Sequence, residues 1–320
     1  MAQPFSILVA GDANVDLVLR GDVVPRFGQA EQLLDSGELV LGGSASITAC
    51  GLARLGVATA LVARVGNDVF GHFTRQALVA AGVTIDTVAT DAVLPTGISV
   101  ILSAPHDRAI LTVPGTIPTL DADAVVAAIG AASHVHFASY FLQPSLAATL
   151  PALLAALRDR GITTSLDTNW DPAERWNTLG EVLPHVDFLL PNVEELRAIG
   201  AALGVPATSD EATARELASL GPRIVVKAGR AGGWSVADRT VVSTSPGLAV
   251  EVVDTTGAGD SFNAGYLAAI ANGIDDESTR LEWAAAAGSL STLGAGGTGA
   301  QPTLTELTEA MAQHRTARPA

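Results

Sequence analysis

The chain of 320 residues is poor in cysteine, in basic residues and in long hydrophobic runs. Its single cysteine, Cys50, cannot form an internal disulfide, and no cysteine and histidine residues are spaced as zinc ligands. We therefore expect Cys50 to be a small buried apolar residue. Lysine and arginine number 18 against 33 acidic residues, which gives a formal net charge of −15. Because nucleic acids and anionic membranes select basic surfaces, neither is an expected partner.

No apolar run reaches the roughly 18 residues that a membrane-spanning helix requires. The N-terminus also lacks a basic segment followed by a cleavable apolar one, so the cytoplasm is the expected location. The chain does have 48% hydrophobic and only 16% charged residues, which is typical of a soluble globular protein. Its length is enough for one large domain or two smaller ones.

The stretch at 253–265, with the sequence VDTTGAGDSFNAG, joins an anion-binding turn to a carboxylate. The β-branched apolar residues at 248–253 predict a strand, and the apolar spacing at 261–270 predicts a helix, so the glycines between them form a turn. Glycine lets the backbone approach a phosphate closely, and a helix N-terminus adds partial positive charge. Asp260 would repel a phosphate there, and its best explanation is that it accepts a proton from an attacking hydroxyl. A glycine turn with Asp260 as a simple helix cap is the alternative.

The nine residues DTTGAGDSF at 254–262 resemble the signature of the ribokinase-like carbohydrate kinases, also called the phosphofructokinase B type. In that family the second aspartate of the signature is the catalytic base, and the Gly-Ala-Gly amides form the anion hole. The resemblance therefore implies that Asp260 is the base and that Gly257, Ala258 and Gly259 hold the transferring phosphoryl group. It extends along nearly the whole chain and implies ATP and magnesium (Mg2+) as cofactors.

Strands and helices alternate between residues 133 and 190, which predicts an α/β fold with parallel strands and helices on both faces of the sheet. The segments at about 17–41 and 94–114 instead contain short β-prone pieces separated by glycine and proline. They are either ordinary surface hairpins or one small sheet. The family resemblance favours a four-stranded lid, set into a single ribokinase-like domain of residues 1–320, and a homodimer formed through that lid. We expect Asp68, before another predicted helix, to be its cap.

Asp16 lies just beyond a predicted buried strand, at the end where open α/β sheets bind ligands, although it could also be a surface turn residue. Gly42 and Gly43 precede a predicted helix. In the family an aspartate like Asp16 binds substrate hydroxyls, and a glycine pair lets backbone amides approach the sugar. The small-molecule partner expected here is therefore a sugar or sugar-like compound.

The family also has an asparagine four positions after the second glycine, and this chain has Ile47 there. An apolar side chain cannot form the hydrogen bond of that asparagine. Three explanations are open: the substrate lacks the hydroxyl, Ser46 or Thr48 replaces the asparagine, or the substrate is not a sugar. The first would make the pocket less polar and suit a deoxygenated or nucleoside-like substrate.

Asp167 and Asn169 follow another predicted strand and resemble the Asp-x-Asn element on the substrate side of the family's site. Asp167 could also be a buried cap. Members acting on ketoses and sugar acids often carry an arginine two residues after this asparagine, and Asp171 stands there. The missing cation makes an anionic sugar a less expected substrate.

The nucleotide side is predicted from two further elements. Asn192 and Glu195 lie three apart at a helix start, which is the pattern of a capping box and also of the family's Asn-x-x-Glu, where polar groups hold water-bridged magnesium. Lys227 precedes a glycine turn that could support the phosphates or the ribose, although a lysine at a strand end is often solvated. The ATP contacts implied by the resemblance are Asn192, Lys227, Gly229, Gly232, Thr256 and Asn263.

A potassium ion (K+) is a further possibility, since many family members bind one between the carbonyls of the Asp-Thr-Thr segment and a later loop that here spans 294–302. Asp254 and Thr256 would then lie at that site. The sequence thus predicts an ATP-dependent kinase that phosphorylates a hydroxyl of a small sugar-like substrate. The alternatives are a nucleoside kinase of the same family and a catalytically silent sensor that binds nucleotide or metabolite. Ile47 motivates the sensor, and an intact Asp260 argues against it.

Overall fold

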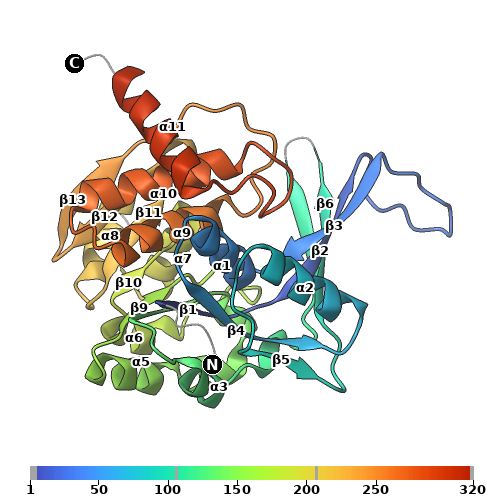
Figure 1. Ribbon diagram of the computed structural model, residues 1–320, viewed down its shortest axis with the longest axis horizontal. Helices are drawn as coiled ribbons and strands as arrows, with labels where there is room; N and C mark the ends of the chain where they lie inside the picture. Colours follow the sequence, from blue (N-terminus) through green and yellow to red (C-terminus); the bar gives the residue numbers. More distant parts are fainter. Residues whose placement is uncertain (1–5, 105–106, 206–207, 318–320) are drawn as a thin grey trace.

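The computed structural model describes residues 6–104, 107–205 and 208–317, and Figure 1 shows their arrangement. Within these residues the main sheet has nine strands: β1 (Ile7–Ala10), β4 (Thr59–Gly66), β5 (Val88–Asp91), β8 (His134–Phe137), β9 (Thr163–Leu166), β10 (Phe188–Leu189), β11 (Arg223–Lys227), β12 (Gly233–Ala237) and β13 (Thr240–Ser245). Their order across the sheet is β13-β12-β11-β10-β9-β8-β1-β4-β5. Only β12 and β13 pair antiparallel to their neighbours. The predicted mostly parallel α/β sheet is confirmed.

Helices cover both faces of this sheet, as predicted (Figure 1). The helices on one face are α1 (Ser44–Arg54), α2 (Val69–Ala80), α9 (Ala258–Ala271), α10 (Glu277–Ser291) and α11 (Leu304–Ala317). Those on the other face are α3 (Ala122–Ala128), α4 (Pro144–Ala147), α5 (Leu150–Asp159), α6 (Leu179–Val182), α7 (Val193–Ala202) and α8 (Asp210–Ala218). Short 3-10 turns are η1 (Ile117–Thr119), η2 (Tyr140–Leu142), η3 (Leu183–His185) and η4 (Gly229–Ala231).

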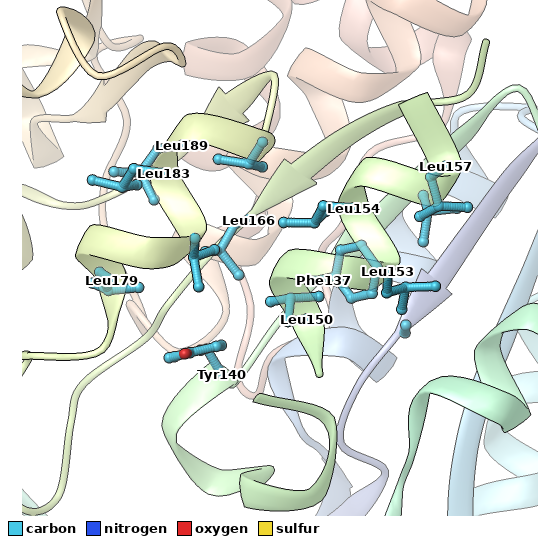
Figure 2. Close-up of a cluster of buried hydrophobic side chains, with 14 of the residues drawn as sticks. Phe137, Tyr140, Leu150, Leu153, Leu154, Leu157, Leu166, Leu179, Leu183 and Leu189 are labelled. Atoms are coloured by element: carbon cyan, nitrogen blue, oxygen red, sulfur yellow. The ribbon is translucent and has the colours of Figure 1, made fainter. Parts of the chain in front are cut away.

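Helix α5 shows why its sequence folds against the sheet. Leu150, Leu154 and Leu157 recur at helical spacing and form a buried stripe. This stripe packs over Phe137 of β8 and Leu166 of β9, as Figure 2 shows. Burying each leucine contributes about 1.5–3 kcal/mol, so the stripe fixes the helix on the sheet. The strands are thereby held rigidly, and their carboxyl ends can position polar side chains.

A second, smaller sheet has the order β3-β2-β6-β7 and stands beside the main one (Figure 1). Its strands are β2 (Asn14–Arg20), β3 (Ser36–Gly42), β6 (Gly97–Ser103) and β7 (Arg108–Val113). Strands β2 and β6 pair in parallel although they come from distant segments. The predicted small sheet is therefore present, and residues 105–106 between β6 and β7 lie outside the described residues. Its action as a lid stays a prediction.

The strand predicted at 248–253 is wrong, because this segment has no regular secondary structure. Instead of pairing with a strand, its backbone contacts helix α10 and the residue after it. Leu248 N–H donates to Ser289 Oγ at 3.0 Å, and Val253 N–H donates to Thr292 O at 2.8 Å. The apolar side chains that suggested a strand are partly exposed, with Val253 65% accessible. Leu248, Val250 and Val252 of this segment line a cavity rather than a sheet.

Two smaller predictions are confirmed. Asp68 is the N-cap of α2, and its carboxylate accepts from Gly71 N–H at 2.8 Å. Cys50 is buried within α1 and has a free thiol.

Among the described residues, no helix is both long and apolar enough to cross a membrane.

Candidate active site

The carboxyl ends of three neighbouring strands bring polar residues to one edge of the main sheet. Asp167 follows β9, Asn192 follows β10, and Lys227 ends β11. Parallel strands end at the same edge, so residues that are far apart in the chain meet there. Helix α9 begins beside them with its N-cap at Gly257.

The turn before α9 requires its first glycine. Gly257 has a φ of +70°, a left-handed conformation that side chains rarely adopt. A Cβ atom there would lie 2.6 Å from the Cα of Gly297, so the later glycine loop packs directly on the turn. Ala258 N–H donates to Thr255 O at 3.2 Å, at the long end of the normal range. The amides of this helix N-terminus suit an anion.

Asp260 lies in the first turn of α9 and is half-buried. Its Oδ1 accepts a short hydrogen bond from the hydroxyl of Ser44, the first residue of α1. Ser44 Oγ in turn accepts from Asn169 Nδ2 at 3.1 Å. Desolvation, followed by the nearby Asp167, raises the pKa of Asp260 to about 7, while Ser44 and Lys227 oppose the rise. Two side chains thus orient a carboxylate that changes protonation near neutral pH.

Asp12 positions Ser44 by holding the first turn of α1. Its carboxylate accepts from the backbone N–H of Ser44 at 3.2 Å and from that of Ala45 at 3.0 Å, so it caps the first turn of α1. The cap fixes the helix end that carries Ser44. Sequence reasoning did not single out Asp12, and it took Ser44 only for the cap of α1, whereas the N-cap is Gly43 and the Ser44 hydroxyl contacts Asp260.

A buried ion pair lies next to the Gly257–Gly259 turn. Lys227 Nζ contacts Asp167 Oδ2 at 2.5 Å, and Asn263 Nδ2 donates to the same oxygen at 2.6 Å. Burial lowers the pKa of the Lys227 ammonium, but the carboxylates of Asp167 and Glu195 outweigh it and raise that pKa. A Cβ atom on Gly259 would lie 3.8 Å from Lys227 Nζ, so the ammonium is adjacent to the turn. Lys227 is buried, which rules out the solvated alternative.

Asp167 has no exposed surface, and its Oδ1 accepts from Asn169 N–H at 3.1 Å. Both of its oxygens are therefore engaged by the protein. This arrangement favours a buried positioning residue over a direct substrate ligand. Asn169 is less enclosed and holds Ser44, so it lies nearer to the reacting groups.

Asn192 and Glu195 form the reciprocal capping box of α7, with both hydrogen bonds at 2.8 Å. Glu195 is buried, and burial raises its pKa to about 7, against the effect of Lys227. The capping bond uses Oε2, and Oε1 accepts no hydrogen bond from the described residues. The pair thus caps a helix and still presents a carboxylate oxygen near Lys227. Across the described ranges, no group of three or more acidic, histidine or cysteine residues could hold a metal directly.

The predicted substrate residues Asp16, Gly42 and Gly43 do come together. Asn14 Nδ2 donates to Asp16 Oδ1 at 3.0 Å, and burial together with Asp12 raises the pKa of Asp16 to about 7. A Cβ on Gly42 would lie 2.1 Å from Asp16 Oδ1, which explains the need for glycine there. The Gly42–Gly43 pair leaves room for the side chains of Asn14 and Asp16 beside the start of α1.

The Ser46 side chain does not point toward Asp16, Gly42 and Gly43 as a substrate ligand would. It is fully buried, and its hydroxyl donates to Asp12 O at 3.1 Å. Thr48 is equally buried. Neither side chain is therefore positioned to replace the family's asparagine, because α1 turns both into the protein. Ile47 is only 3% exposed and packs against Gly257 and Gly297.

A cavity of about 480 Å³ adjoins the Gly257–Gly259 turn, with Ala258 and Gly259 in its lining. This volume is within the usual range for small-molecule sites. Its polar end is formed by Lys227, Gly259 and Ala258, and its outer wall is mostly apolar. The lining also includes Gly229, Gly232, Leu248, Val250, Phe262, Ala285 and Thr292. The loose segment at 248–253 thus forms one wall, which accounts for its apolar residues.

Three predicted ATP residues, Lys227, Gly229 and Gly232, line this cavity, whereas Asn192, Thr256 and Asn263 are not among its lining residues. Asn263 is buried against Asp167, and Thr256 faces the small sheet, where its Oγ1 accepts from Arg108 Nη1 at 3.1 Å. Thr256 N–H and Oγ1 donate to Asp254 Oδ1 at 2.9 and 2.8 Å. The turn at Gly257–Gly259 therefore separates an apolar cavity from a polar face that carries Asp260 and Asp16.

Comparison with known proteins identifies related sequences along the whole chain. Residues 5–304 match the family model described as pfkB family carbohydrate kinase. The chain is 30% identical over 306 residues to ribokinase of Bacillus subtilis, covering 95% of this chain and 98% of that one. It is 32% identical to an ATP-dependent ribose-1-phosphate kinase of Halopiger xanaduensis, with 93% and 95% covered, and 33% identical to a fructokinase of Klebsiella pneumoniae, with 86% and 88% covered.

Solved structures agree with these sequence matches. The structure of Arabidopsis thaliana ribokinase complexed with ribose and ATP superposes with a TM-score of 0.83 at 26% identity, covering 97% of this chain and 99% of that one. Vibrio cholerae fructokinase, in its form with fructose, ADP and calcium bound, gives a TM-score of 0.77 at 26% identity, with 96% and 99% covered. The predicted ribokinase-like fold is confirmed.

Proposed function

The chain belongs to the pfkB family of carbohydrate kinases, and we propose that it transfers the terminal phosphoryl group of ATP to a hydroxyl of a small sugar or sugar-like substrate. The observation that carries this proposal is the position of Asp260. Its carboxylate lies beside the turn that separates the apolar cavity from the polar face, it is oriented by Ser44, and its pKa is raised to about 7. A base with a pKa near the working pH is deprotonated in much of the protein and still has enough proton affinity to take a proton from a hydroxyl.

In the proposed reaction, Asp260 accepts the proton of the acceptor hydroxyl as the hydroxyl oxygen bonds to the γ-phosphorus. The bond between that phosphorus and the bridging oxygen of ADP breaks in the same displacement. Charge that develops on the phosphoryl oxygens meets the amides of Gly257, Ala258 and Gly259, and the Lys227 ammonium next to them. No covalent phosphoenzyme is needed.

The cavity suits the nucleotide. Its apolar outer wall, with Phe262 and Leu248, fits a purine base, and its inner end at Lys227 and Gly259 fits the phosphates. The structure of Arabidopsis ribokinase was solved with ATP, which supports the same use here. Thr256 and Asn263 would then act indirectly, by holding the turn and the ion pair.

Magnesium fits the donor set of this chain. Glu195 has one carboxylate oxygen free of the cap, and a hydrated magnesium ion needs few direct protein ligands. When bound, the ion would neutralise charge on the ATP phosphates. Glu195 would hold it through water, and the capping bonds with Asn192 would keep the Glu195 side chain in place.

The acceptor is proposed to lie against Asp16, Gly42 and Gly43, with Asn169 nearby. The ribokinase, fructokinase and ribose-1-phosphate kinase relatives support a sugar class without selecting one member. A nucleoside acceptor stays the alternative within the family. The oriented Asp260 argues against a silent sensor, since binding alone does not require a base.

A homodimer through the small sheet is a further part of this proposal. Apolar side chains are exposed on that sheet and its connecting loop, with Phe27 99% and Leu33 84% accessible. Exposed apolar groups at this density favour a protein partner, and a second copy of this chain is the partner that we propose. Light scattering coupled to size exclusion would test it, with Phe27→Ser and Leu33→Ser expected to shift a dimer to monomer.

The test of the function is an ADP-release screen with ATP and magnesium. The acceptor panel contains ribose, fructose, ribose 1-phosphate, sugar acids and nucleosides, and mass spectrometry of the products follows each hit. We expect one class of sugar to give stoichiometric ADP and phosphorylated product, with Asp260→Asn as the control that loses about 10²–10⁴-fold in turnover. Tight ADP binding without turnover on any acceptor would favour the sensor instead.

A further inference from the structure

The small sheet carries two arginines in one row. In its register Arg20 of β2 pairs with Ser103 of β6, and Ser103 pairs with Arg108 of β7. Both guanidinium groups contact the segment that leads into the catalytic turn. Arg20 Nη2 contacts Asp254 Oδ2 at 3.3 Å, and Arg108 Nη1 donates to Thr256 Oγ1 at 3.1 Å. The small sheet is therefore docked on residues 254–256 through charged side chains.

The side-chain carboxylate of Asp254 has no free acceptor position in this arrangement. Its Oδ1 accepts from the N–H and the hydroxyl of Thr256. Its Oδ2 accepts from Gly296 N–H at 3.1 Å and from Arg20 Nη2. A carboxylate has about four lone-pair sites, and four donors occupy them. The Asp254 side chain is only 16% exposed, so water adds little.

A potassium ion does not fit beside this carboxylate. A cation requires oxygen acceptors around it, whereas the groups that surround Asp254 Oδ2 are an amide N–H and a guanidinium, both positive at their hydrogens. Potassium could bind the carboxylate only after Arg20 had moved away. Arg20 already presents a positive charge at the same oxygen, and its other nitrogen is held by Glu38 at 3.0 Å.

We propose that Arg20 takes the place of a monovalent cation at Asp254, so that the kinase works without potassium. This inference rests on the proposed function. The charge is carried by the small sheet, so it reaches Asp254 only while that sheet is docked. Docking then fixes Asp254 and Thr256, and through them the backbone that enters Gly257. Arg20 acts through these residues and is a positioning residue for the catalytic turn.

The first measurement is turnover with the best acceptor of the screen, at constant ionic strength, in potassium, sodium or N-methylglucamine chloride. We expect the wild-type rate to be the same in all three. Arg20→Gln should lose about tenfold or more in kcat without potassium, because the charge that holds Asp254, and through it the backbone entering Gly257, is gone. Potassium, or millimolar guanidinium, should restore part of that loss.

The second measurement does not depend on turnover. Thallium(I), a spectroscopic substitute for potassium, is titrated into the protein in the presence of ADP and followed by thallium NMR. The wild type should bind none at a specific site, and Arg20→Gln should bind one. The control is Arg26→Gln, which removes an arginine of the loop between β2 and β3 whose only ion-pair partner among the described residues is the exposed Asp22. It should behave as the wild type in both measurements.

A wild-type rate that rises severalfold with potassium would overturn the proposal, and so would specific thallium binding by the wild type. An Arg20→Gln protein with unchanged kinetics in N-methylglucamine would do the same. If Arg20→Gln folds but is inactive in every salt, Arg20→Lys decides, since activity without potassium supports the proposal and inactivity opposes it. If no acceptor is ever phosphorylated, the proposed function fails, while thallium binding still reports whether Asp254 holds a cation.

Discussion

Ser44 donates its hydroxyl hydrogen to the carboxylate of Asp260, although the two residues are 216 positions apart in the chain. Ser44 is the first residue of α1, and Asp260 lies in the first turn of α9. The two helices pack side by side on one face of the sheet, so their first turns meet at its carboxyl edge. Ser44 thereby links the acceptor side of the site to the proposed base.

The first prediction concerns this hydrogen bond. Ser44→Ala removes a bond that lowers the pKa of Asp260, so that pKa should rise above its value of about 7. The pH at which kcat/KM reaches half its maximum should move upward by the same amount, and kcat at neutral pH should fall. Ser44→Thr keeps a hydroxyl and should restore the original midpoint. An unmoved midpoint in Ser44→Ala would show that Ser44 does not act on Asp260.

The second prediction is the pH dependence of the wild-type enzyme. Asp260 must be deprotonated to accept the hydroxyl proton, and its pKa is raised to about 7 by desolvation and Asp167. We therefore expect kcat/KM to rise with pH through about 7 and then level off. Stopped assays between pH 5.5 and 9, at saturating magnesium, would measure the midpoint. A profile that is flat from pH 5.5 upward would mean that Asp260 keeps an ordinary carboxyl pKa or is not the base.

The third prediction separates the two roles of the ion pair under the turn. Lys227→Met leaves Asp167 buried without its cation, and breaking a buried pair in this way costs about 3–5 kcal/mol of unfolding free energy. Adding Asp167→Asn to it removes the unpaired charge and should recover much of that loss. The double variant should still turn over about 10²–10³-fold more slowly, because the ammonium next to Gly259 is missing.

Urea unfolding and kcat, measured on both single variants and the double variant, check this prediction. Lys227→Arg is the matched control, since it keeps the charge in a different shape. A double variant that regains both stability and turnover would reduce Lys227 to a structural role. A double variant as unstable as Lys227→Met would show that the cost does not come from the unpaired carboxylate.

The sequence predicted much of the fold and several residues of the candidate site, for identifiable physical reasons. Buried parallel strands show as short apolar runs, and the residues at or just beyond their ends lie at the ligand-binding edge, which is how Asp167 and Lys227 were found. Asp16 was expected in a loop at the end of the first strand, but it lies within β2 of the small sheet. The signature around Asp260 needed no long-range information, because turn, base and helix are contiguous.

What the sequence did not reveal depends on contacts between distant segments. Ser44 and Arg20 carry no local pattern, and only the packing of α1 on α9 and of the small sheet on residues 254–256 gives them partners. The apolar residues at 248–253 were mistaken for a strand, because a cavity wall and a buried strand have the same composition. Asp167 could not be assigned to Lys227 before the two strand ends were known to be neighbours.

The fourth prediction tests what the isoleucine at the family's asparagine position does. Ile47 is 3% exposed, and its side chain packs against Gly257 and Gly297, so it supports the Gly257–Gly259 turn from inside the protein. Ile47→Asn should bury an amide without partners, at a cost of about 1–3 kcal/mol, and should lower kcat on every acceptor alike. Ile47→Val removes one methylene, should cost only about 0.5–1.5 kcal/mol, and should leave turnover nearly unchanged.

Two measurements decide whether Ile47 supports the turn or contacts the substrate. They are thermal unfolding and the ranking of ribose, fructose and nucleoside acceptors. If Ile47 supports the turn, Ile47→Asn lowers the melting temperature and leaves the ranking as it is. If it faces the substrate, the same variant gains relative activity on the most hydroxylated sugar with little loss of stability, because the new amide then has a hydroxyl to bind. The contact of Ile47 with two backbone segments leads us to expect the first result, since a side chain enclosed on both sides cannot reach a ligand without moving the turn itself.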